Sequence, residues 1–380
     1  MSLTAEALPG QDVLAAIRAP FAGFGGAPVD APVLLPLGVL LDLAGEAMRP
    51  RLVVVGEGVE PAALRPDFTI PVAQAHIAAG NGAARYQYEG KAFRASPTGV
   101  DRPVEFLQIG VESYGAKDDV AGEDAAVAGL AWASARAGGR DDLSLVLGDA
   151  GLFAAFVGAL GVPQAAATRL VRAFRAGRGL ERELASAQAA DAAEPNGGRL
   201  AALLAERPEE EAAEVLGELW RLAGIQPVGG RGPAEIVHRL AQRSEARRGP
   251  QLSPAEAGLI ARFLAVSAPP KAALDQVERL AYEARADLEQ ALAVWMQRLK
   301  ALTASGAPEA AMTLAPGFVR PFGYYDGALF EVRSAALGPD RPVAAGGRYD
   351  GLLARLGGPE DGRAVGCMVR PGRAWKGAGA

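Results

Sequence analysis

The chain has 380 residues, of which 50% are hydrophobic and 22% are charged, and its formal net charge is −5. This length allows either one large core or two domains with a substantial buried interior. The acidic balance gives no general electrostatic reason to bind a polyanion, so nucleic acid is disfavoured as a partner.

The residue inventory also limits location and metal chemistry. The single cysteine, Cys367, excludes an internal disulfide, and the first residues lack the basic stretch and apolar run of a secretory signal. Charged residues or glycine interrupt every apolar stretch before it reaches the roughly 20 residues of a membrane span. We therefore expect a cytoplasmic protein with no membrane partner. We also expect no metal site, and both histidines, His76 and His238, are predicted to be structural.

The first 150 residues predict mixed α and β structure. Pro32 and Pro36 punctuate an apolar run that leads into an amphipathic segment over residues 39–48. Residues 51–55 follow with a short run of leucine and valine, which predicts a strand.

Two longer strands follow, over residues 85–94 and 104–114, and the proline- and glycine-containing stretch between them predicts a long-looped hairpin. Because alternate residues share one face of a strand, each strand presents polar and aromatic groups together. These are Tyr86, Tyr88 and Arg94 on the first strand and Phe106, Gln108, Gly110, Glu112 and Tyr114 on the second. Gln and Glu alone are typical of a solvated sheet face, whereas the added aromatic groups and the cation favour a binding surface. Both interpretations stay open at this point.

Helical patterns dominate the middle of the chain. Residues 123–137 predict a helix that ends at two glycines, and residues 143–147 predict another strand. From residue 151 to 304, Ala, Leu, Glu and Arg recur at helical spacing, with breaks that separate several helices. Ser253-Pro-Ala-Glu256 predicts a capping box at the start of one of them. An apolar stripe at helical spacing predicts core or an interface, and it comprises Leu288, Leu292, Trp295 and Leu299.

The last part of the chain returns to β character, with predicted strands over residues 328–332 and 364–369. Between them lies the glycine-rich run over residues 345–351. It lacks the Gly-Lys-Ser/Thr ending of a phosphate loop, and its Gly346-Gly347 pair by itself predicts a turn.

Several of these segments form an ordered set, namely Leu64–Pro71, Phe93-Arg94, Gln108–Glu112, Arg320–Tyr325 and Gly346–Leu352. Together they resemble the motifs of the histidyl-tRNA synthetases, a family with the class II aminoacyl-tRNA synthetase fold. The resemblance implies an α/β fold of the α+β type, with an antiparallel sheet flanked by helices. Residues 1–150 and 305–375 would form this discontinuous core, and residues 151–304 would form a helical insertion.

The same resemblance implies a pocket for a histidine-like ligand. Its polar end would be held by Asp67, Gln108 and Glu112. The imidazole ring would face Tyr325 and Tyr349. These roles agree with general chemistry, because an ammonium group pairs with carboxylates and a flat ring packs on aromatic side chains.

The cationic positions imply binding without ATP chemistry. Arg320 would lie near the ligand's carboxylate, and Arg94 would be the remnant of the motif 2 arginine. Other positions that handle ATP in synthetases are altered, because Phe68 replaces a glycine and Gly323 replaces an aspartate. The motif 3 ending reads Arg370-Pro-Gly-Arg373 here, and its proline argues against the helix that normally follows.

A synthetase core with altered ATP positions and no anticodon domain resembles the regulatory subunits of ATP phosphoribosyltransferase. The resemblance implies no catalytic residues, no cofactor and a short-form catalytic subunit as partner in the first step of histidine biosynthesis, with histidine as the inhibitory ligand. It also implies a homodimer within a hetero-oligomer, because Pro32 lies where the class II dimer motif falls. Two alternatives stay open, a divergent adenylating enzyme and a free histidine-sensing module.

Overall fold

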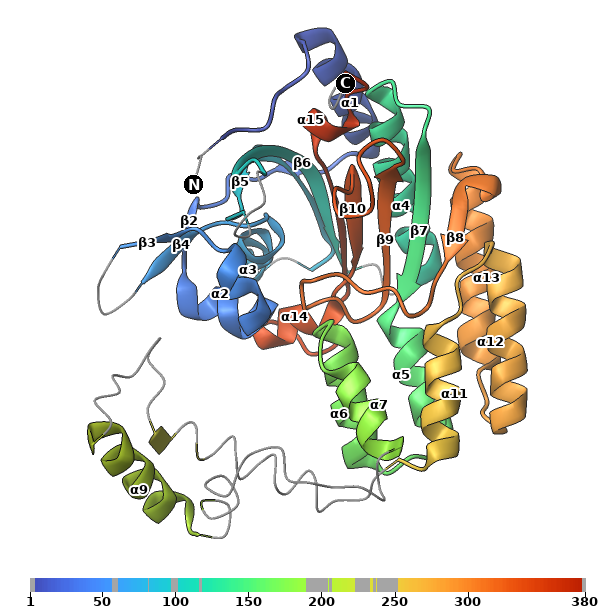
Figure 1. Ribbon diagram of the computed structural model, residues 1–380. Coiled ribbons are helices and arrows are strands. Elements are labelled where there is room, and N and C mark those ends of the chain that lie inside the picture. The colour runs from blue at the N-terminus through green and yellow to red at the C-terminus, as the bar shows by residue number, and fades with distance from the viewer. Residues whose placement is uncertain are drawn as a thin grey trace.

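The computed structural model describes residues 4–56, 61–80, 82–96, 102–115, 118–188, 207–222 and 252–377, with the single positions 204, 233, 234 and 237. Within these residues, a large central sheet carries helices on both faces (Figure 1). The predicted structural role of His238 lies outside the described residues.

The central sheet has eight strands among the described residues. In spatial order they are β1 (Ala27–Pro28), β5 (Ala84–Phe93), β6 (Glu105–Tyr114), β11 (Ala364–Val369), β10 (Ala344–Arg348), β9 (Ala328–Ser334), β7 (Leu143–Asp149) and β8 (Met312–Leu314). The outer pairs β1–β5 and β7–β8 are parallel, and the pairs between them are antiparallel. The predicted hairpin is the β5–β6 pair, in which Tyr88 lies opposite Gly110. The prediction of a mixed α/β fold with a largely antiparallel sheet is confirmed.

Each face of this sheet has its own hydrophobic cluster. The covering helices are α1 (Gln11–Phe24) and α4 (Val120–Ala137) on one face, and α2 (Leu37–Ala44), α3 (Thr69–Ala79) and α14 (Asp350–Arg355) on the other. Side chains alternate along a strand, so Ile109 and Val111 of β6 pack in the α4 cluster. Phe106 and Tyr114 pack in the opposite cluster. The predicted polar face of the hairpin therefore points away from α4.

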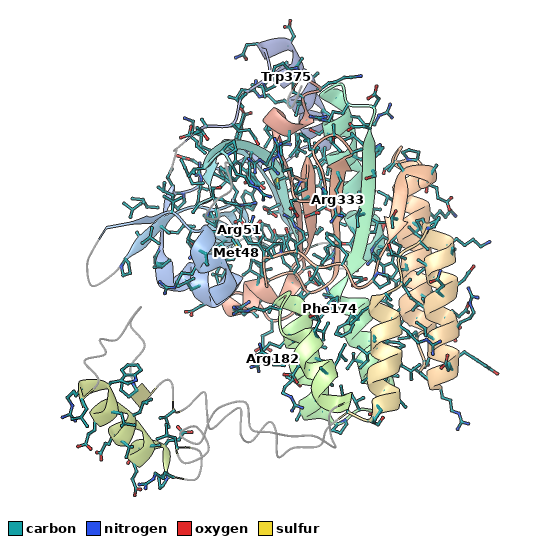
Figure 2. The ribbon with its side chains drawn as sticks, viewed as in Figure 1. Met48, Arg51, Phe174, Arg182, Arg333 and Trp375 are labelled. Carbon is teal, nitrogen blue, oxygen red and sulfur yellow. The ribbon has the colours of Figure 1, made fainter. Side chains whose placement is uncertain are left out.

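A small second sheet lies next to α2. Its strands are β2 (Leu34–Pro36), β4 (Ala62–Leu64) and β3 (Val54–Val55), and the 3-10 helix η1 (Glu46–Arg51) precedes β3. The predicted strand over residues 51–55 is wrong at its start, because Arg51 ends η1 and the strand begins at Val54. Pro50 explains this difference, since its fixed φ and missing N–H suit a helical turn better than a strand ladder. Met48, also in η1, is fully buried, and Figure 2 shows it near Arg51.

Helices follow β7 as predicted. They are α5 (Ala150–Ala159), α6 (Gln164–Arg175), α7 (Leu180–Gln188), α9 (Glu209–Leu222), α11 (Pro254–Leu264), α12 (Pro270–Ala284) and α13 (Glu289–Ala304). Ser253 and Glu256 form the predicted capping box of α11. Phe174, labelled in Figure 2, stacks on Phe153 with ring centroids 4.1 Å apart. Phe153 and Phe174 share one hydrophobic cluster with the central sheet, and the division into a core and a helical insertion stays a prediction.

The apolar stripe on α13 belongs to the core. Leu288 and Trp295 are buried in the cluster on the α4 side, and Leu292 and Leu299 pack against it. The indole Nε1 of Trp295 donates a hydrogen bond of 2.8 Å to Asp149. The prediction that this stripe belongs to the core is therefore confirmed for Leu288 and Trp295.

Gly346 and Gly347 do not form a turn. They lie inside β10, which pairs with β9 and β11. A Cβ atom on Gly346 would lie 2.2 Å from the carbonyl oxygen of Gly366 on β11 and 2.7 Å from the ring of Phe330 on β9. The glycine pair thus allows the neighbouring strands to approach closely, and such close backbone approach is a common reason for glycine inside a strand.

The chain after β11 continues into α15 (Pro371–Ala374). The expectation that Pro371 prevents a helix here is wrong, because proline occupies the first helical position, where its missing N–H costs nothing. The helix still covers only four residues. Among the helices of the described ranges, none has both the length and the apolar character that a membrane span needs.

The packing at Gly346 predicts that Gly346→Ala destabilises the fold. Overpacking of this kind typically costs about 1–3 kcal/mol in the free energy of unfolding. Gly258→Ala is a matched control, because Gly258 lies inside α11 and no described atom is within 4 Å of its added Cβ. That change should stabilise the protein by about 0.5–1 kcal/mol. Denaturant unfolding of both variants tests this, and a Gly346→Ala protein as stable as wild type would contradict it.

Candidate functional site

A cavity lies on the sheet face that points away from α4. It contains about 280 Å³ of space between atoms, including its open mouth. Strands β5, β6, β10 and β11, the start of α3 and the loop before β9 contribute its walls. The lining residues are Asp67, Thr69, Tyr88, Arg94, Glu112, Arg320, Phe322, Tyr324, Tyr325, Ala345, Gly366, Cys367 and Met368.

Glu112 is the central acidic group of this cavity. It is 1% exposed, and its carboxyl group accepts a hydrogen bond of 2.9 Å from the Thr69 hydroxyl. The Tyr349 hydroxyl also donates to it, and the Tyr88 hydroxyl lies 3.4 Å away. Burial raises the pKa of Glu112 to about 8, although the hydroxyl donors favour the charged form. At neutral pH this carboxyl group is therefore largely protonated, and a bound cation would stabilise its charged form.

Asp67 is the second acidic group, and it lies in the loop before α3. The Tyr324 hydroxyl donates a hydrogen bond of 2.9 Å to its Oδ2 atom. No described residue forms a hydrogen bond with Oδ1. Burial raises the pKa of Asp67, and the nearby Arg94 opposes this shift. Sequence reasoning missed Tyr324, although the Tyr324-Tyr325 pair within the Arg320–Tyr325 motif could have indicated that both rings face the pocket.

Two arginines add positive charge to the same cavity. Arg320 is 4% exposed, and its Nε and Nη1 atoms have no hydrogen-bond partner among the described residues. Its nearest acidic partner is Glu331, at 3.7 Å. Arg94 donates from Nε to the Pro66 carbonyl oxygen at 2.9 Å, and burial and the neighbouring Arg51 lower its pKa to about 10. Because both carboxyl groups have raised pKa values, the cavity has a surplus of cationic groups that an anionic ligand group could pair with.

The two remaining predicted residues do not line the cavity. Tyr349 lies behind Glu112 and contacts Tyr325 with ring centroids 6.4 Å apart. Gln108 is fully buried on the same face of β6, and its amide oxygen and nitrogen have no partner among the described residues. The interpretation of this strand face as a solvated surface is therefore wrong. Burial of Gln108 and Glu112 fits a binding face instead.

The ATP-related positions are filled by the protein's own side chains. Phe68 is buried and stacks on Tyr88 at 4.3 Å, with the Arg65 guanidinium 3.9 Å from its ring centroid. Arg373, at the position where the resemblance predicts the motif 3 arginine, forms an ion pair of 3.1 Å with Glu6. The described residues also contain no group of three or more His, Cys, Asp or Glu side chains that could hold a metal ion.

His76 has contacts that fit its predicted structural role. Its ring stacks on Tyr114 at 4.0 Å, and its Nδ1 atom lies 3.4 Å from the Tyr86 hydroxyl. Burial lowers its pKa, which favours the neutral ring.

A second cavity, of about 290 Å³, lies between α4, α13 and the sheet. Its charged groups already pair with one another. Asp124 of α4 accepts hydrogen bonds from Arg298 of α13 at 2.8 Å and from Arg348 of β10 at 2.8 Å. The rest of its lining is mainly apolar, so we assign it a structural role.

Comparison with known sequences identifies one matching family and several named relatives. The sequence model of the histidyl-tRNA synthetase family matches residues 3–230 and 234–371. Three relatives bear the name ATP phosphoribosyltransferase regulatory subunit. The one from Brucella anthropi is 34% identical over 90% of both chains, and the one from Mesorhizobium japonicum is 36% identical over 87% of both. The relative from Rhizobium meliloti is 35% identical over 89% of both.

Solved structures show the same fold. The Bacillus halodurans protein described as an ATP phosphoribosyltransferase regulatory subunit/histidyl-tRNA synthetase aligns with a TM-score of 0.62 and 20% identity, covering 97% of this chain and 79% of its own. Histidyl-tRNA synthetase from Nostoc aligns with a TM-score of 0.60 and 16% identity, covering 98% and 73%. At these identities the likeness establishes the fold alone.

The environment of Glu112 predicts a pH-dependent stability. Its pKa of about 8 in the folded protein exceeds the ordinary value of 4.5, so folding takes up a proton. The stability from this group is complete below about pH 4.5 and is lost as the pH rises through about 8. Denaturant unfolding between these limits should show wild type losing stability relative to Glu112→Gln, which does not titrate. If the difference in unfolding free energy between wild type and Glu112→Gln stays constant over this pH range, Glu112 is ionised throughout the range.

Proposed function

The chain belongs to the family of ATP phosphoribosyltransferase regulatory subunits, which has the histidyl-tRNA synthetase fold, and from this we propose its function in detail. It is a non-catalytic subunit that acts with a short-form catalytic subunit of ATP phosphoribosyltransferase. The complex carries out the first step of histidine biosynthesis, and histidine inhibits it through this chain. The observation that carries the ligand assignment is the cavity around Glu112 and Arg320.

The cavity offers a complementary group for each part of free histidine. The ammonium group would pair with Glu112 and Asp67, whose charged forms it would stabilise. The carboxylate would pair with Arg320, whose guanidinium has unpartnered donors among the described residues. The imidazole would pack on the ring of Tyr325, which is also part of the lining. Gln108 and Tyr349 would not contact the ligand directly. Tyr349 would orient Glu112 through its hydrogen bond.

The contacts at the former ATP positions support a role without adenylate chemistry. That chemistry depends on cations that are free to neutralise phosphate charge. Arg373 is paired with Glu6, and the bulk of Phe68 stands where synthetases have glycine. The chain therefore keeps groups suited to an amino acid, while positions suited to a triphosphate are occupied.

An exposed apolar patch supports the proposed homodimer within the hetero-oligomer. The patch lies on the small sheet, beside Pro32, where the class II dimer motif was predicted. Its residues are Leu34 and Val55, each more than 40% exposed, together with the exposed Pro36. The pairing register places these three side chains on one face of the small sheet. Apolar side chains gathered on one surface are a common mark of protein association.

The adenylating alternative predicts histidine-dependent exchange of pyrophosphate into ATP, whereas the regulatory proposal predicts none. We expect no histidine-dependent exchange of pyrophosphate into ATP by the purified chain and no charging of tRNA. The control is histidine binding, measured by calorimetry in the same preparation. Detected binding establishes that the protein in the exchange assay is folded and able to bind its ligand. Robust exchange would overturn the regulatory proposal.

The histidine proposal predicts a loss of inhibition when residue 112 can no longer ionise in response to the ligand's ammonium group. In a complex with the short-form catalytic subunit, Glu112→Gln should raise the inhibitory concentration of histidine about tenfold or more. The reason is that a hydrogen bond to a charged partner contributes on the order of 1–3 kcal/mol to binding. Enzyme assays with a histidine titration measure this effect.

Glu123→Gln is the matched control for that experiment. Glu123 pairs with Arg85 at 2.9 Å and with Ser113, whose side chain lies on the opposite face of β6 from Glu112. Its loss should affect stability and leave inhibition unchanged. Unchanged inhibition in a well-folded Glu112→Gln complex would exclude this cavity as the histidine site. Failure of the chain to associate with the catalytic subunit would favour the free-sensor alternative.

A further inference from the structure

Arg298 of α13 lies between two buried carboxylates. Its Nε and Nη2 atoms donate hydrogen bonds of 3.0 and 2.8 Å to Asp124 on α4. Its Nη1 atom lies 3.7 Å from the Oδ2 atom of Asp149, at the end of β7, and has no hydrogen-bond partner among the described residues. All three side chains are buried. A shift of about 1 Å would give the contact between Arg298 and Asp149 the length of an ordinary hydrogen bond.

Trp295 competes with Arg298 for the same oxygen of Asp149. Its indole Nε1 atom donates a hydrogen bond of 2.8 Å to Oδ2, and its ring lies 4.5 Å from the Arg298 guanidinium. The other oxygen, Oδ1, accepts hydrogen bonds from the amides of Gly151 and Leu152 at the start of α5. The ion pairs that give the cavity under α13 its structural role therefore also allow a second arrangement, in which Arg298 pairs with Asp149.

Asp124 connects these two arrangements to the cavity on the opposite face of the sheet. Its Oδ1 atom accepts a hydrogen bond of 2.8 Å from Arg348, at the end of β10. The next residue, Tyr349, donates a hydrogen bond to Glu112. When Arg298 leaves Asp124, the whole carboxylate is available to Arg348. The end of β10 is then held more firmly, and so is the hydroxyl group of Tyr349.

We propose that Arg298 is a switch residue with two positions, one on Asp124 and one on Asp149, and that the ligand cavity controls it. A ligand ammonium group needs the charged form of Glu112, which the Tyr349 hydroxyl stabilises. The ligand therefore favours the Asp149 position, and helix α13 responds to ligand binding. By thermodynamic reciprocity, the position of Arg298 alters the affinity for the ligand. This inference rests on the proposed binding of histidine in the cavity.

Two substitutions outside the cavity lining should move Arg298 in opposite directions. Trp295→Phe removes the competing indole donor, so Asp149 attracts Arg298 more strongly and histidine should bind at least about fivefold more tightly. Asp149→Asn removes the attracting charge but keeps an oxygen that can cap α5. Histidine should then bind at least about fivefold more weakly. Calorimetric titration of the full chain measures both affinities, and thermal melting confirms that each variant is folded.

Trp132→Phe is the matched control for the tryptophan substitution. Trp132 is buried in the same hydrophobic cluster as Trp295, and its Nε1 atom has no hydrogen-bond partner among the described residues. This change should leave the affinity for histidine unchanged. In a Tyr349→Phe background, which lacks the hydroxyl link to Glu112, Trp295→Phe and Asp149→Asn should lose their effects on affinity. If both variants bind histidine more weakly than wild type, or if neither differs from it, the switch is excluded.

The indole signal of Trp295 in a nitrogen–proton NMR spectrum gives a second measurement on the wild-type chain. Saturating histidine should shift this signal, because Arg298 then approaches the oxygen that accepts the indole hydrogen bond. The signal of Trp132 should stay in place. An unmoved Trp295 signal at saturation would overturn the switch, while the measured binding would leave histidine as the ligand of the cavity. Failure of wild type to bind histidine would overturn the proposed ligand and the switch together.

Discussion

Burial of the acidic side chain of Glu112 on one face of β6 is the constraint on which the candidate site depends. A carboxyl group in this interior is stable when it is protonated or surrounded by donors. Glu112 meets both conditions, and its donors come from distant parts of the chain, Thr69 at the start of α3 and Tyr349 after β10. One side chain thus holds together the hairpin, a covering helix and the C-terminal part of the sheet. A ligand that changes the charge of Glu112 would act on all of these contacts at once.

The opposite face of the sheet is stabilised by a different arrangement of charge. There Asp124 is paired with Arg298 and Arg348, so a buried carboxylate is balanced by guanidinium groups. Arg348 and Tyr349 are neighbours in the chain, and their side chains reach Asp124 on one face and Glu112 on the other. The end of β10 therefore connects the ion pairs under α13 to the cavity. A displacement of Tyr349 would reach Arg348 through the chain, and from there α13 through the ion pairs of Asp124 with Arg348 and Arg298.

The parts of this structure that local sequence determines could be predicted, and those that depend on distant contacts could not. Alternation along β5 and β6 identified the hairpin and the polar face, because a period of two is a property of the strand itself. Gly346-Gly347 gave the wrong prediction, since its role depends on Gly366, a residue of the neighbouring strand. The partnership of Glu6 with Arg370 joins residues 364 positions apart and has no local signal. Tyr324 was missed because adjacent aromatic residues point to one cavity only when their loop has a particular shape.

The two buried arginines Arg373 and Arg320 follow one physical rule. A buried charged group needs a partner, and where a ligand no longer supplies it, the chain itself can. At Arg373 the partner is Glu6, which lies before α1. At Arg320 the described residues leave two guanidinium nitrogens without a hydrogen bond, and the nearest carboxylate is 3.7 Å away. The first site has an internal substitute for an anion and the second does not. This difference is the physical reason to assign ligand binding to the cavity around Arg320 and a structural ion pair to Arg373.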